Sequence, residues 1–374
     1  MKKKEKSFAC EPKPVSQRPH FPRRKTRQIK VGSVAIGGGA PIAVQSMTKT
    51  DTRDVEATLT QISRMEQAGC EIIRLAVPDE EAVEALGEIR NRVSLPLVAD
   101  IHFDHRLALA SLAKGIDGLR INPGNIGSKE KVKEVVQRAK DKEIPIRIGV
   151  NSGSLEKVLL EKYGEANPEA MVESALRHVK ILEDLDFKLI KISLKASDVF
   201  RTYKAYQLMA QKVDYPFHAG ITEAGGFFSG AVKSAAGLAL LLKEGLADTI
   251  RVSLTAPPED EVGVAFKILS SLGVRSHGLD FISCPVCGRA EVDIFKIALD
   301  IERRLSSVKN NIKVAVMGCM VNGPGEAKEA DIGLACGRGI GVIFKQGKLY
   351  RRIEEEDKII SEFVREVENF VNSK

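Results

Sequence analysis

Short apolar runs alternate with longer amphipathic segments along most of this chain. The runs are rich in β-branched residues, which is typical of buried strands, and in the longer segments apolar residues recur every three or four positions, which is typical of helices. Segments 55–68 and 170–185 are two of the predicted helices. The predicted strands are 41–47, 71–77, 96–101, 118–122, 145–151, 188–194, 216–221 and 249–254. Strand–helix units repeated in this way predict an α/β fold, a (β/α)₈ TIM barrel.

An open, doubly wound parallel sheet is the alternative to a barrel. Such a sheet usually carries a glycine-rich phosphate loop directly after its first strand. Here Gly37, Gly38 and Gly39 precede the first predicted strand, so they are expected to form a turn. The position of the glycines therefore favours the barrel.

The pattern changes near residue 275. A strand leads into Cys284-Pro-Val-Cys287, and a helix over 292–305, a strand over 312–317, a Gly/Pro loop, strands over 332–335 and 341–344 and a helix over 354–370 follow. This order predicts a smaller C-terminal α+β domain. We therefore expect a tail over 1–22, a barrel over 23–275 and a second domain over 276–374.

Composition narrows the class of protein. The 374 residues are 43% hydrophobic, with a net charge of +7, and Lys, Arg and Pro are concentrated in residues 1–30, which predicts a mobile basic tail. No aromatic residues alternate with these charges as a nucleic-acid platform would require, so no nucleic-acid partner is expected. No apolar run is long enough for a bilayer span or a signal core, and the six cysteines show no disulfide framework. These features predict a reduced, cytoplasmic protein with no membrane partner.

Polar residues stand at the carboxyl ends of nearly all the predicted strands. In a TIM barrel these ends form the active-site face. The residues are Gln45, Ser46, Arg74, Asp100, His102, Arg120, Asn122, Arg147, Asn151, Lys195, Glu223, Arg251 and Ser253. Several share strand parity, as Arg147 and Asn151 do, so we expect their side chains to point into the barrel.

Five of these residues are cations, and we expect them to crowd one mouth of the barrel. They are Arg74, Arg120, Arg147, Lys195 and Arg251. Like charges in a low-dielectric cup repel unless an anion binds, and guanidinium groups match phosphate oxygens. Some of the cations could instead pair with Asp100, Glu71 or Glu223, but these acids are too few for all five. The pattern therefore predicts a diphosphate or similar anion.

Two further residues at this mouth are candidates for proton transfer. Glu223 ends the seventh strand and could relay a proton to a bound substrate, and His102 could act as an acid or donate to a phosphate.

The second candidate site is a set of thiols. Cys284, Cys287 and Cys319 are soft ligands, typical of zinc or of an iron–sulfur cluster. A zinc ribbon needs a second Cys-x-x-Cys, but position 322 is Asn, so a cluster is favoured. The fourth ligand is Cys336 or Glu326; a carboxylate binds iron less firmly and could leave, which opens that iron to a substrate oxygen.

Several motifs, in this order, resemble one enzyme family. The motifs are Arg24-Lys-Thr-Arg-Gln28, Val44-Gln-Ser-Met47, Ala99-Asp-Ile-His-Phe103, Leu119-Arg-Ile-Asn-Pro-Gly-Asn125, Arg147-Ile-Gly-Val-Asn151, Thr222-Glu-Ala-Gly225, Cys284-Pro-Val-Cys-Gly-Arg289 and Met317-Gly-Cys-Met-Val-Asn-Gly-Pro-Gly-Glu-Ala327. Together they resemble the bacterial 4-hydroxy-3-methylbut-2-enyl diphosphate synthases of the methylerythritol phosphate pathway of isoprenoid biosynthesis.

The resemblance implies an iron–sulfur oxidoreductase. In that family 2-C-methyl-D-erythritol 2,4-cyclodiphosphate undergoes reductive ring opening and loses water, with two electrons delivered through a [4Fe–4S] cluster from reduced flavodoxin or ferredoxin. The resemblance also implies a homodimer in which one subunit's cluster domain caps the partner's barrel.

The resemblance assigns roles by position. The cluster ligands would be Cys284, Cys287, Cys319 and Glu326, and the catalytic residues Glu223, Glu326 and His102. The substrate-binding residues would be Arg74, Asp100, Arg120, Arg147, Asn151, Lys195, Arg251 and Ser253.

Two other functions compete with this hypothesis. One is a metal-independent barrel transferase or aldolase with a structural zinc in the second domain, since pterin-dependent barrels share the cations at strand ends. The other is a nucleic-acid-binding module that uses a zinc knuckle and the basic tail; it leaves the recurrence of cations at strand ends unexplained.

Overall fold

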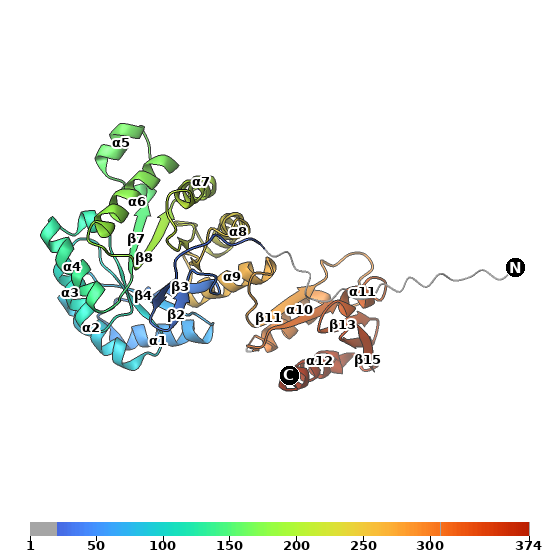
Figure 1. Cartoon of the computed structure of the whole chain (residues 1–374). Coiled ribbons are helices and arrows are strands. Elements are labelled where there is room, and N and C mark those ends of the chain that lie inside the picture. Colours follow the sequence, from blue (N-terminus) through green and yellow to red (C-terminus); the bar gives the residue numbers. More distant parts are fainter. Residues whose placement is uncertain (1–20, 307, 374) are drawn as a thin grey trace. The chain divides into compact units, whose positions relative to one another are not determined.

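An eight-stranded parallel sheet organises the N-terminal part of the chain (Figure 1). In this computed structural model the described residues are 21–306 and 308–373, and they divide into two compact units at Arg275 and Ser276. Residues 1–20 of the predicted tail lie outside the described residues.

Each predicted barrel strand is present, so the TIM-barrel prediction is confirmed. The strands are β3 (Ala43–Met47), β4 (Ile72–Ala76), β5 (Leu97–Asp100), β6 (Gly118–Arg120), β7 (Ile146–Asn151), β8 (Ile190–Lys195), β9 (His218–Ala219) and β10 (Thr249–Ile250). Their order in the sheet is β8-β7-β6-β5-β4-β3-β10-β9. A parallel bridge between Ile192 and Phe217 joins β8 to the chain before β9 and closes the barrel.

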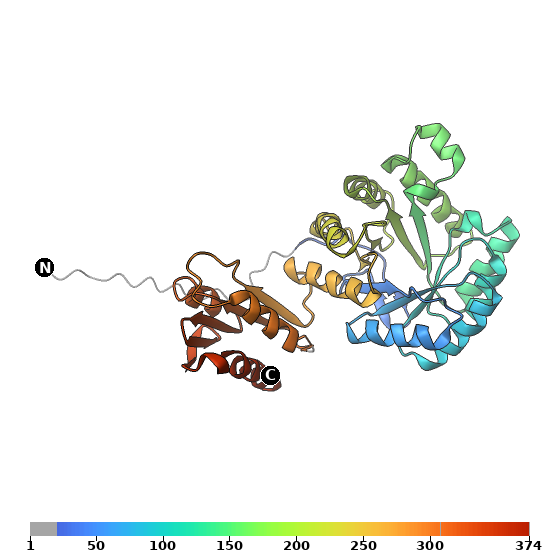
Figure 2. The ribbon, with the colours of Figure 1, turned by 180° about the vertical axis from the view of Figure 1, so that it is seen from behind.

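Helices cover the outside of this sheet (Figures 1 and 2). They are α1 (Val55–Gln67), α2 (Glu80–Arg92), α3 (His105–Ala113), α4 (Lys129–Asp141), α5 (Lys157–Tyr163), α6 (Pro168–Glu183), α7 (Val199–Ala210), α8 (Phe227–Lys243) and α9 (Pro258–Ser271). Aspartates start several of them: the Asp54, Asp79 and Asp198 carboxylates each accept from a backbone N–H in the first turn. The caps fix where the chain leaves each strand-end loop and turns back along the barrel.

Strand parity separates an apolar outer face from a polar inner face. Ile146 and Ile148 belong to the main apolar cluster, and Arg147 lies between them. Ile190 and Ile192 flank Lys191 in the same way. Because successive side chains of a strand point to opposite faces, the cations face the barrel interior.

A β-hairpin before the barrel was not predicted from the sequence. Strands β1 (Ile29–Val31) and β2 (Val34–Ile36) pair antiparallel. Their buried apolar residues form one cluster with Ala43, Ile72 and Val98, which lie near the starts of β3, β4 and β5. The hairpin thus supplies apolar packing at the end of the barrel opposite the strand-end loops. The glycines at 37–39 follow it with positive φ angles, as the predicted turn requires.

The prediction of a mobile tail through residue 30 is wrong for its last residues. Arg23 forms an ion pair with Asp248 at 2.9 Å. Arg24 donates to the carbonyls of Val213 and Tyr215, and its guanidinium lies over a buried phenylalanine ring. The composition of this segment predicts disorder. Its arginines instead make tertiary contacts, which composition alone does not reveal.

The C-terminal unit is a five-stranded mixed sheet with helices. Its strands, in sheet order, are β11 (Leu279–Ser283), β12 (Ile312–Met317), β13 (Ile332–Gly337), β14 (Ile340–Lys345) and β15 (Lys348–Ile353). The first three are parallel, and β14 and β15 are antiparallel to their neighbours. The helices are α10 (Ile294–Arg304), α11 (Gly323–Lys328) and α12 (Ile359–Asn372). Ile301, Phe363 and Val367 pack into one buried cluster with the sheet.

Two elements of this unit differ from the prediction. β15 was missed because its sequence, Lys-Leu-Tyr-Arg-Arg-Ile, is mostly exposed and lacks apolar alternation. The predicted Gly/Pro loop contains the short helix α11, despite two glycines and a proline that disfavour helix. Its buried Ala327 lies against Gly333, where an added Cβ would be 2.2 Å from the Ala327 carbonyl oxygen. Tertiary packing therefore outweighs local propensity.

Among the described residues, no helix combines the length and the apolar character that a bilayer span requires.

The hairpin generates the first prediction. Ile36 is fully buried, so Ile36→Ala should lower the free energy of unfolding of the barrel by about 2–4 kcal/mol through lost burial and a residual cavity. Urea unfolding followed by circular dichroism measures this. Lys30→Ala, at an exposed position of the same hairpin, is the control and should change stability by less than about 0.5 kcal/mol. Equal, small effects of both variants would contradict a structural role for the hairpin.

Candidate functional site

One row of charged side chains crosses four neighbouring strands of the barrel. The parallel register places Asp100 beside Arg120, Arg120 beside Arg147 and Arg147 beside Lys191. Residues in register on adjacent parallel strands point to the same face, which is here the interior. The sheet itself therefore brings one acid and three cations together.

Asp100 is the acid at the start of this row. It is buried, and its carboxylate lies 3.1 Å from Arg120 Nη1, 3.6 Å from Arg74 Nε and 3.6 Å from His102 Nε2. Burial alone would raise the pKa of Asp100, but the charges of Arg74 and Arg120 and the hydrogen bond from His102 hold that pKa far below its ordinary value. Asp100 is therefore ionised and compensates part of the positive charge.

Arg120 is held by backbone as well as by Asp100. Its Nη2 donates to the Gly149 carbonyl at 3.2 Å, and its Nη1 lies 2.7 Å from His102 Nε2. A Cβ at position 149 would lie 2.9 Å from Arg120 Nε, so glycine on β7 gives the guanidinium its space. The Gly149 N–H donates in turn to the Asn122 side chain at 3.0 Å, which gives this predicted strand-end residue a structural contact.

Arg147 and Lys195 have no acidic partner among the described residues. Arg147 is 4% exposed, and its Nε and Nη1 lack any hydrogen-bond partner. Lys195 is 6% exposed. Burial, followed by the charges of neighbouring arginines, lowers the pKa of both groups well below their ordinary values. The charges of these two residues are therefore not compensated by an acid.

The far side of the barrel holds a second acid, which the sequence analysis missed. Glu261 in the first turn of α9 is 1% exposed and accepts from Ser46 Oγ at 3.0 Å and from the Leu254 N–H at 2.9 Å. It also lies 2.9 Å from Lys49 Nζ and 3.7 Å from Arg251 Nη2. An acid at a helix start is normally a solvated residue, so the burial of Glu261 could not be predicted from its position in the sequence.

The interior therefore carries excess positive charge. In the described chain six inward-facing cations, Arg74, Arg120, Arg147, Lys191, Lys195 and Arg251, face the two acids Asp100 and Glu261. The alternative that Glu71 neutralises one of them is wrong, because Glu71 instead binds Arg275 at 2.6 Å. Arg74 directs two donors at the thioether of Met47, which is a weak acceptor. Such a surface suits a multiply charged anion.

The remaining predicted residues lie around the same strand ends. His102 and Glu223 are exposed. Asn151, the last residue of β7, and Ser253, in the segment after β10, are half-buried. Glu223 has a φ of 51°, an unfavourable value for a residue with a side chain, and no side-chain partner within the described ranges. The local backbone thus holds a free carboxylate in the loop after β9.

Two interior residues besides Glu261 were missed from the sequence. Lys191 precedes Lys195 by four positions on the same strand, so strand parity carried the signal for it. His218, on β9, is buried with Nδ1 2.7 Å from Thr249 Oγ1 and Nε2 without a partner. Its strand is too short for parity alone to identify an inner face.

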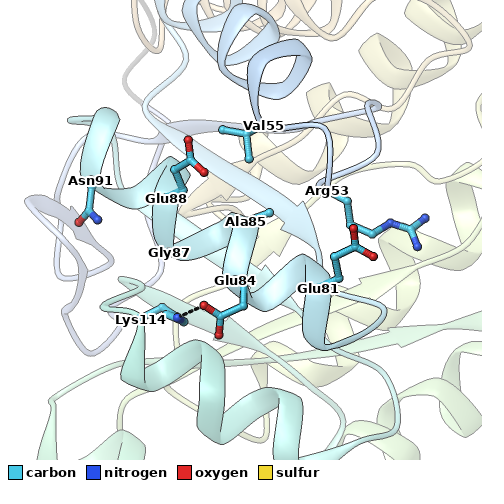
Figure 3. A pocket seen from close by; sticks show the side chains of 9 residues that line it. All are labelled: Arg53, Val55, Glu81, Glu84, Ala85, Gly87, Glu88, Asn91 and Lys114. Carbon is cyan, nitrogen blue, oxygen red and sulfur yellow. Dashed lines mark hydrogen bonds and ion pairs between the residues drawn. The ribbon is translucent and has the colours of Figure 1, made fainter.

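A shallow depression of about 600 Å³ lies on the outer surface of the barrel (Figure 3). Glu81, Glu84 and Glu88 line it, and Glu84 is already paired with Lys114. The acidic side chains that line it make it unsuited to an anionic substrate.

The thiols gather at one edge of the C-terminal sheet. Cys284 directly follows β11 and Cys319 lies two residues after β12, and these strands are parallel neighbours. Cys284 Sγ accepts from the Gly318 N–H at 3.3 Å. The backbone N–H groups of Asn322, Val321 and Gly323 lower the pKa of Cys319, which favours its thiolate. Cys287, in the turn after Cys284, is exposed.

The two candidates for a fourth ligand differ in environment. Cys336 lies within β13, is fully buried in the apolar cluster, and burial raises its pKa to about 12. Glu326 is exposed on α11, the helix that follows Cys319. A buried neutral thiol is a poor ligand without rearrangement, so this environment favours Glu326.

The donor set fits an iron–sulfur cluster better than a single metal ion. Among the described residues, no three His, Cys, Asp or Glu side chains are close enough together to hold one ion. A cluster accepts more widely spaced thiolates because its iron atoms are separate, and N–H groups directed at the sulfurs are typical of cluster sites.

Comparisons with known proteins cover both units. Residues 26–266 match the family described as the GcpE TIM-barrel domain, and residues 280–369 match the GcpE protein C-terminal domain. A protein of Geobacter sulfurreducens, named 4-hydroxy-3-methylbut-2-en-1-yl diphosphate synthase (flavodoxin), is 56% identical over 94% of this chain and 99% of its own length. Proteins with the same name from Thermodesulfovibrio yellowstonii and Acidithiobacillus ferrooxidans are 58% and 59% identical, over 90% of this chain and 97% and 92% of their own lengths.

Among solved structures, the barrel is similar to a dihydropteroate synthase from Stenotrophomonas maltophilia. The TM-score is 0.50 at 12% identity, over 66% of this chain and 97% of that one. At this identity the likeness concerns the fold alone.

The uncompensated cations generate the second prediction. Arg147→Met removes a buried charge that has no acidic partner, so it should raise the stability of the ligand-free barrel by about 1–3 kcal/mol. Thermal unfolding in a low-salt buffer measures the change. Inorganic pyrophosphate should raise the melting temperature of the wild type and leave that of the variant nearly unchanged.

Arg138→Met is the matched control, because Arg138 is exposed on α4, outside the barrel. It should leave both stability and the pyrophosphate effect at wild-type values. A loss of stability in Arg147→Met comparable with that of a core cavity would contradict the assignment of Arg147 as an uncompensated cation.

Proposed function

Because this chain belongs to the GcpE family, whose relatives above are named 4-hydroxy-3-methylbut-2-en-1-yl diphosphate synthase (flavodoxin), we propose that its barrel binds 2-C-methyl-D-erythritol 2,4-cyclodiphosphate for reductive ring opening and dehydration. The resemblance noted in the sequence is thereby confirmed at the level of the family. The chain is an oxidoreductase of isoprenoid biosynthesis.

The excess positive charge inside the barrel is the observation that carries the substrate assignment. Within the described ranges Arg147 and Lys195 have no acidic partner, and Arg74 donates to a thioether that a phosphate oxygen would replace as a better acceptor. Arg120, Arg251, Asn151 and Ser253 line the same strand ends. Bound diphosphate oxygens would relieve the repulsion, and the same donors would stabilise the diphosphate as it leaves the ring carbon.

The thiol set would hold a [4Fe–4S] cluster through Cys284, Cys287, Cys319 and Glu326. When bound, such a cluster supplies electrons one at a time and a Lewis-acidic iron. The carboxylate of Glu326 is the exchangeable ligand in this set, because it binds iron less firmly than the three thiolates. Its exposed position on α11 leaves it room to move away.

Protons for the departing oxygen would come from side chains at the strand ends. Glu223 is exposed, unpaired in the described structure and held on a strained backbone, so it is available to carry a proton to the substrate. His102, which contacts Asp100 and Arg120, would orient the phosphate and donate to it. Asp100 would keep this pair of side chains in place.

Two partners complete the proposal. Reduced flavodoxin or ferredoxin would supply the electrons, in a cytoplasm that keeps the thiols reduced. The substrate must reach both the barrel cations and the cluster, and we propose that a homodimer achieves this, with the cluster domain of one subunit capping the barrel of the other.

The third prediction concerns Glu223. Under anaerobic conditions, with a cluster-loaded protein and a chemical reductant, Glu223→Gln should lower kcat by about 10²–10⁴-fold and change the substrate Kd by only a few-fold. Product formation by mass spectrometry and Kd by calorimetry separate the two effects. Glu244→Gln, on the outside of the barrel after α8, is the control. Wild-type turnover in Glu223→Gln would exclude Glu223 as the proton carrier.

The fourth prediction tests the ligand set. Cys319→Ser should lose the cluster, whereas Cys336→Ala should retain full iron, sulfide and visible absorbance, because Cys336 is a buried core residue. Glu326→Ala should keep the cluster with an altered spectrum. Loss of the cluster in Cys336→Ala with retention in Glu326→Ala would instead support four thiolate ligands. A colourless wild-type protein with stoichiometric zinc would favour the barrel transferase with a structural zinc.

A further inference from the structure

Lys191 is a buried amine deep inside the barrel that the proposed chemistry does not use. It lies on β8 in register with Arg147, one strand over, and four residues before Lys195 on its own strand. Four residues of strand correspond to about 13 Å. Lys191 is 2% exposed, and its Nζ has no hydrogen-bond partner among the residues that the structure describes. It therefore lies below the strand-end residues, next to one of the cations that would bind the diphosphate.

The charged groups that act on Lys191 are Arg147 on β7, Arg74 on β4 and Asp248 before β10. Burial lowers the pKa of His218 on β9 well below its ordinary value, and the charge of Lys191 in turn helps to lower it, so His218 adds no charge of its own. Asp248 is the acid among these groups, and it already accepts from Arg23 and from the Phe217 N–H, each at 2.9 Å. Asp100, the next acid of the row, is held by Arg120 and Arg74. No acid in the described chain is left to pair with the Lys191 amine.

The neighbourhood of Lys191 is polar but incompletely bonded. Among the described residues His218 Nε2 also lacks a hydrogen-bond partner. Buried polar atoms in native proteins normally have partners, and those without a protein partner commonly bind internal water. Internal water at such atoms would let the Lys191 amine exchange a proton with solvent.

We propose that Lys191 is a neutral amine in the empty barrel and takes up one proton when a diphosphate anion binds at the strand ends. The inference rests on the proposed function, which supplies the anion. The anion would cancel the charges of Arg147 and Arg74, which are the groups that repel a proton on Lys191. The proton comes from solvent, and the amine becomes an ammonium; no other bond changes.

The expected range of pH follows from the electrostatics of the empty barrel. Burial, followed by the charges of Arg147 and Arg74, lowers the pKa of Lys191 to about 7. Above that pH the amine is neutral before binding, and an anion that restores its pKa towards the ordinary value causes proton uptake. Below it the amine is already charged, and little uptake remains. Substrate affinity should therefore weaken as the pH rises from 7 to 9.

Isothermal titration calorimetry of the full-length protein tests this with the cyclodiphosphate as the probe. Each phosphorus of that ligand carries a single, strongly acidic proton, so the ligand itself exchanges none near neutral pH. Repeating the titration in buffers of different ionisation enthalpy gives the number of protons taken up. Lys191→Met should reduce the number of protons taken up by about one at pH 8 and by much less at pH 6. It should also make Kd less dependent on pH, with a difference from the wild type of up to about tenfold per pH unit.

Lys188→Met is the matched control, since Lys188 lies just before the same strand, is exposed and pairs with Asp186 at 3.3 Å. It should take up as many protons as the wild type. Lys191→Met removes a buried polar group and keeps a similar length, so it should fold; Lys191→Gln provides a second neutral variant if it does not. Wild-type proton uptake in a folded Lys191 variant would overturn the inference. Failure of the wild type to bind the cyclodiphosphate would instead overturn the proposed function, together with the inference that rests on it.

Discussion

The repulsion between cations inside the barrel is the constraint on which the rest of this structure depends. Charges buried without partners cost several kcal/mol each, and a fold tolerates them only when stable packing elsewhere offsets that cost. Here the sheet register itself forces the guanidinium groups of Arg120 and Arg147 side by side, with the Lys191 amine next in the row. Asp100 and Glu261 relieve only part of the repulsion. Binding of an anion would relieve the remaining repulsion, and that relief contributes to the free energy of anion binding.

The apolar parts of the barrel provide the stability that this interior lacks. The outer face of the sheet packs against the surrounding helices, and the β1–β2 hairpin adds an apolar cluster at the end away from the strand-end loops. The alternation of side chains along each strand separates the charged interior from the apolar outer face, because each inward-facing cation lies between two apolar residues that point outward. The C-terminal unit likewise separates packing from ligand positions. Cys336 packs in the core, while Cys284, Cys287 and Cys319 lie at the sheet edge.

Periodicity was sufficient to predict the barrel, the order of the C-terminal elements and the polar strand ends, since each depends on local sequence. Several of the misses depend on tertiary contacts. The hairpin and the ordered arginines before it look like a tail by composition, α11 forms where glycine and proline disfavour helix, and Glu261 looks like an exposed helix-start acid. Strand parity alone places Lys191 on the inner face of the barrel, but site residues were predicted only at the strand ends. Local pattern indicated a diphosphate-like anion and an iron–sulfur site, and family resemblance supplied the particular substrate and the type of cluster.

The most direct measurement of the central claim is a competition experiment on the wild-type protein, with bound cyclodiphosphate displaced by inorganic pyrophosphate or by 2-C-methyl-D-erythritol, which has the same carbon skeleton and no charge. If uncompensated cations hold the substrate, one cyclodiphosphate should bind per chain, pyrophosphate should displace it, and the uncharged polyol should have no effect even at large excess. Displacement by the polyol as effective as that by pyrophosphate would show that the carbon skeleton, and not the charge, is recognised, and would contradict the account.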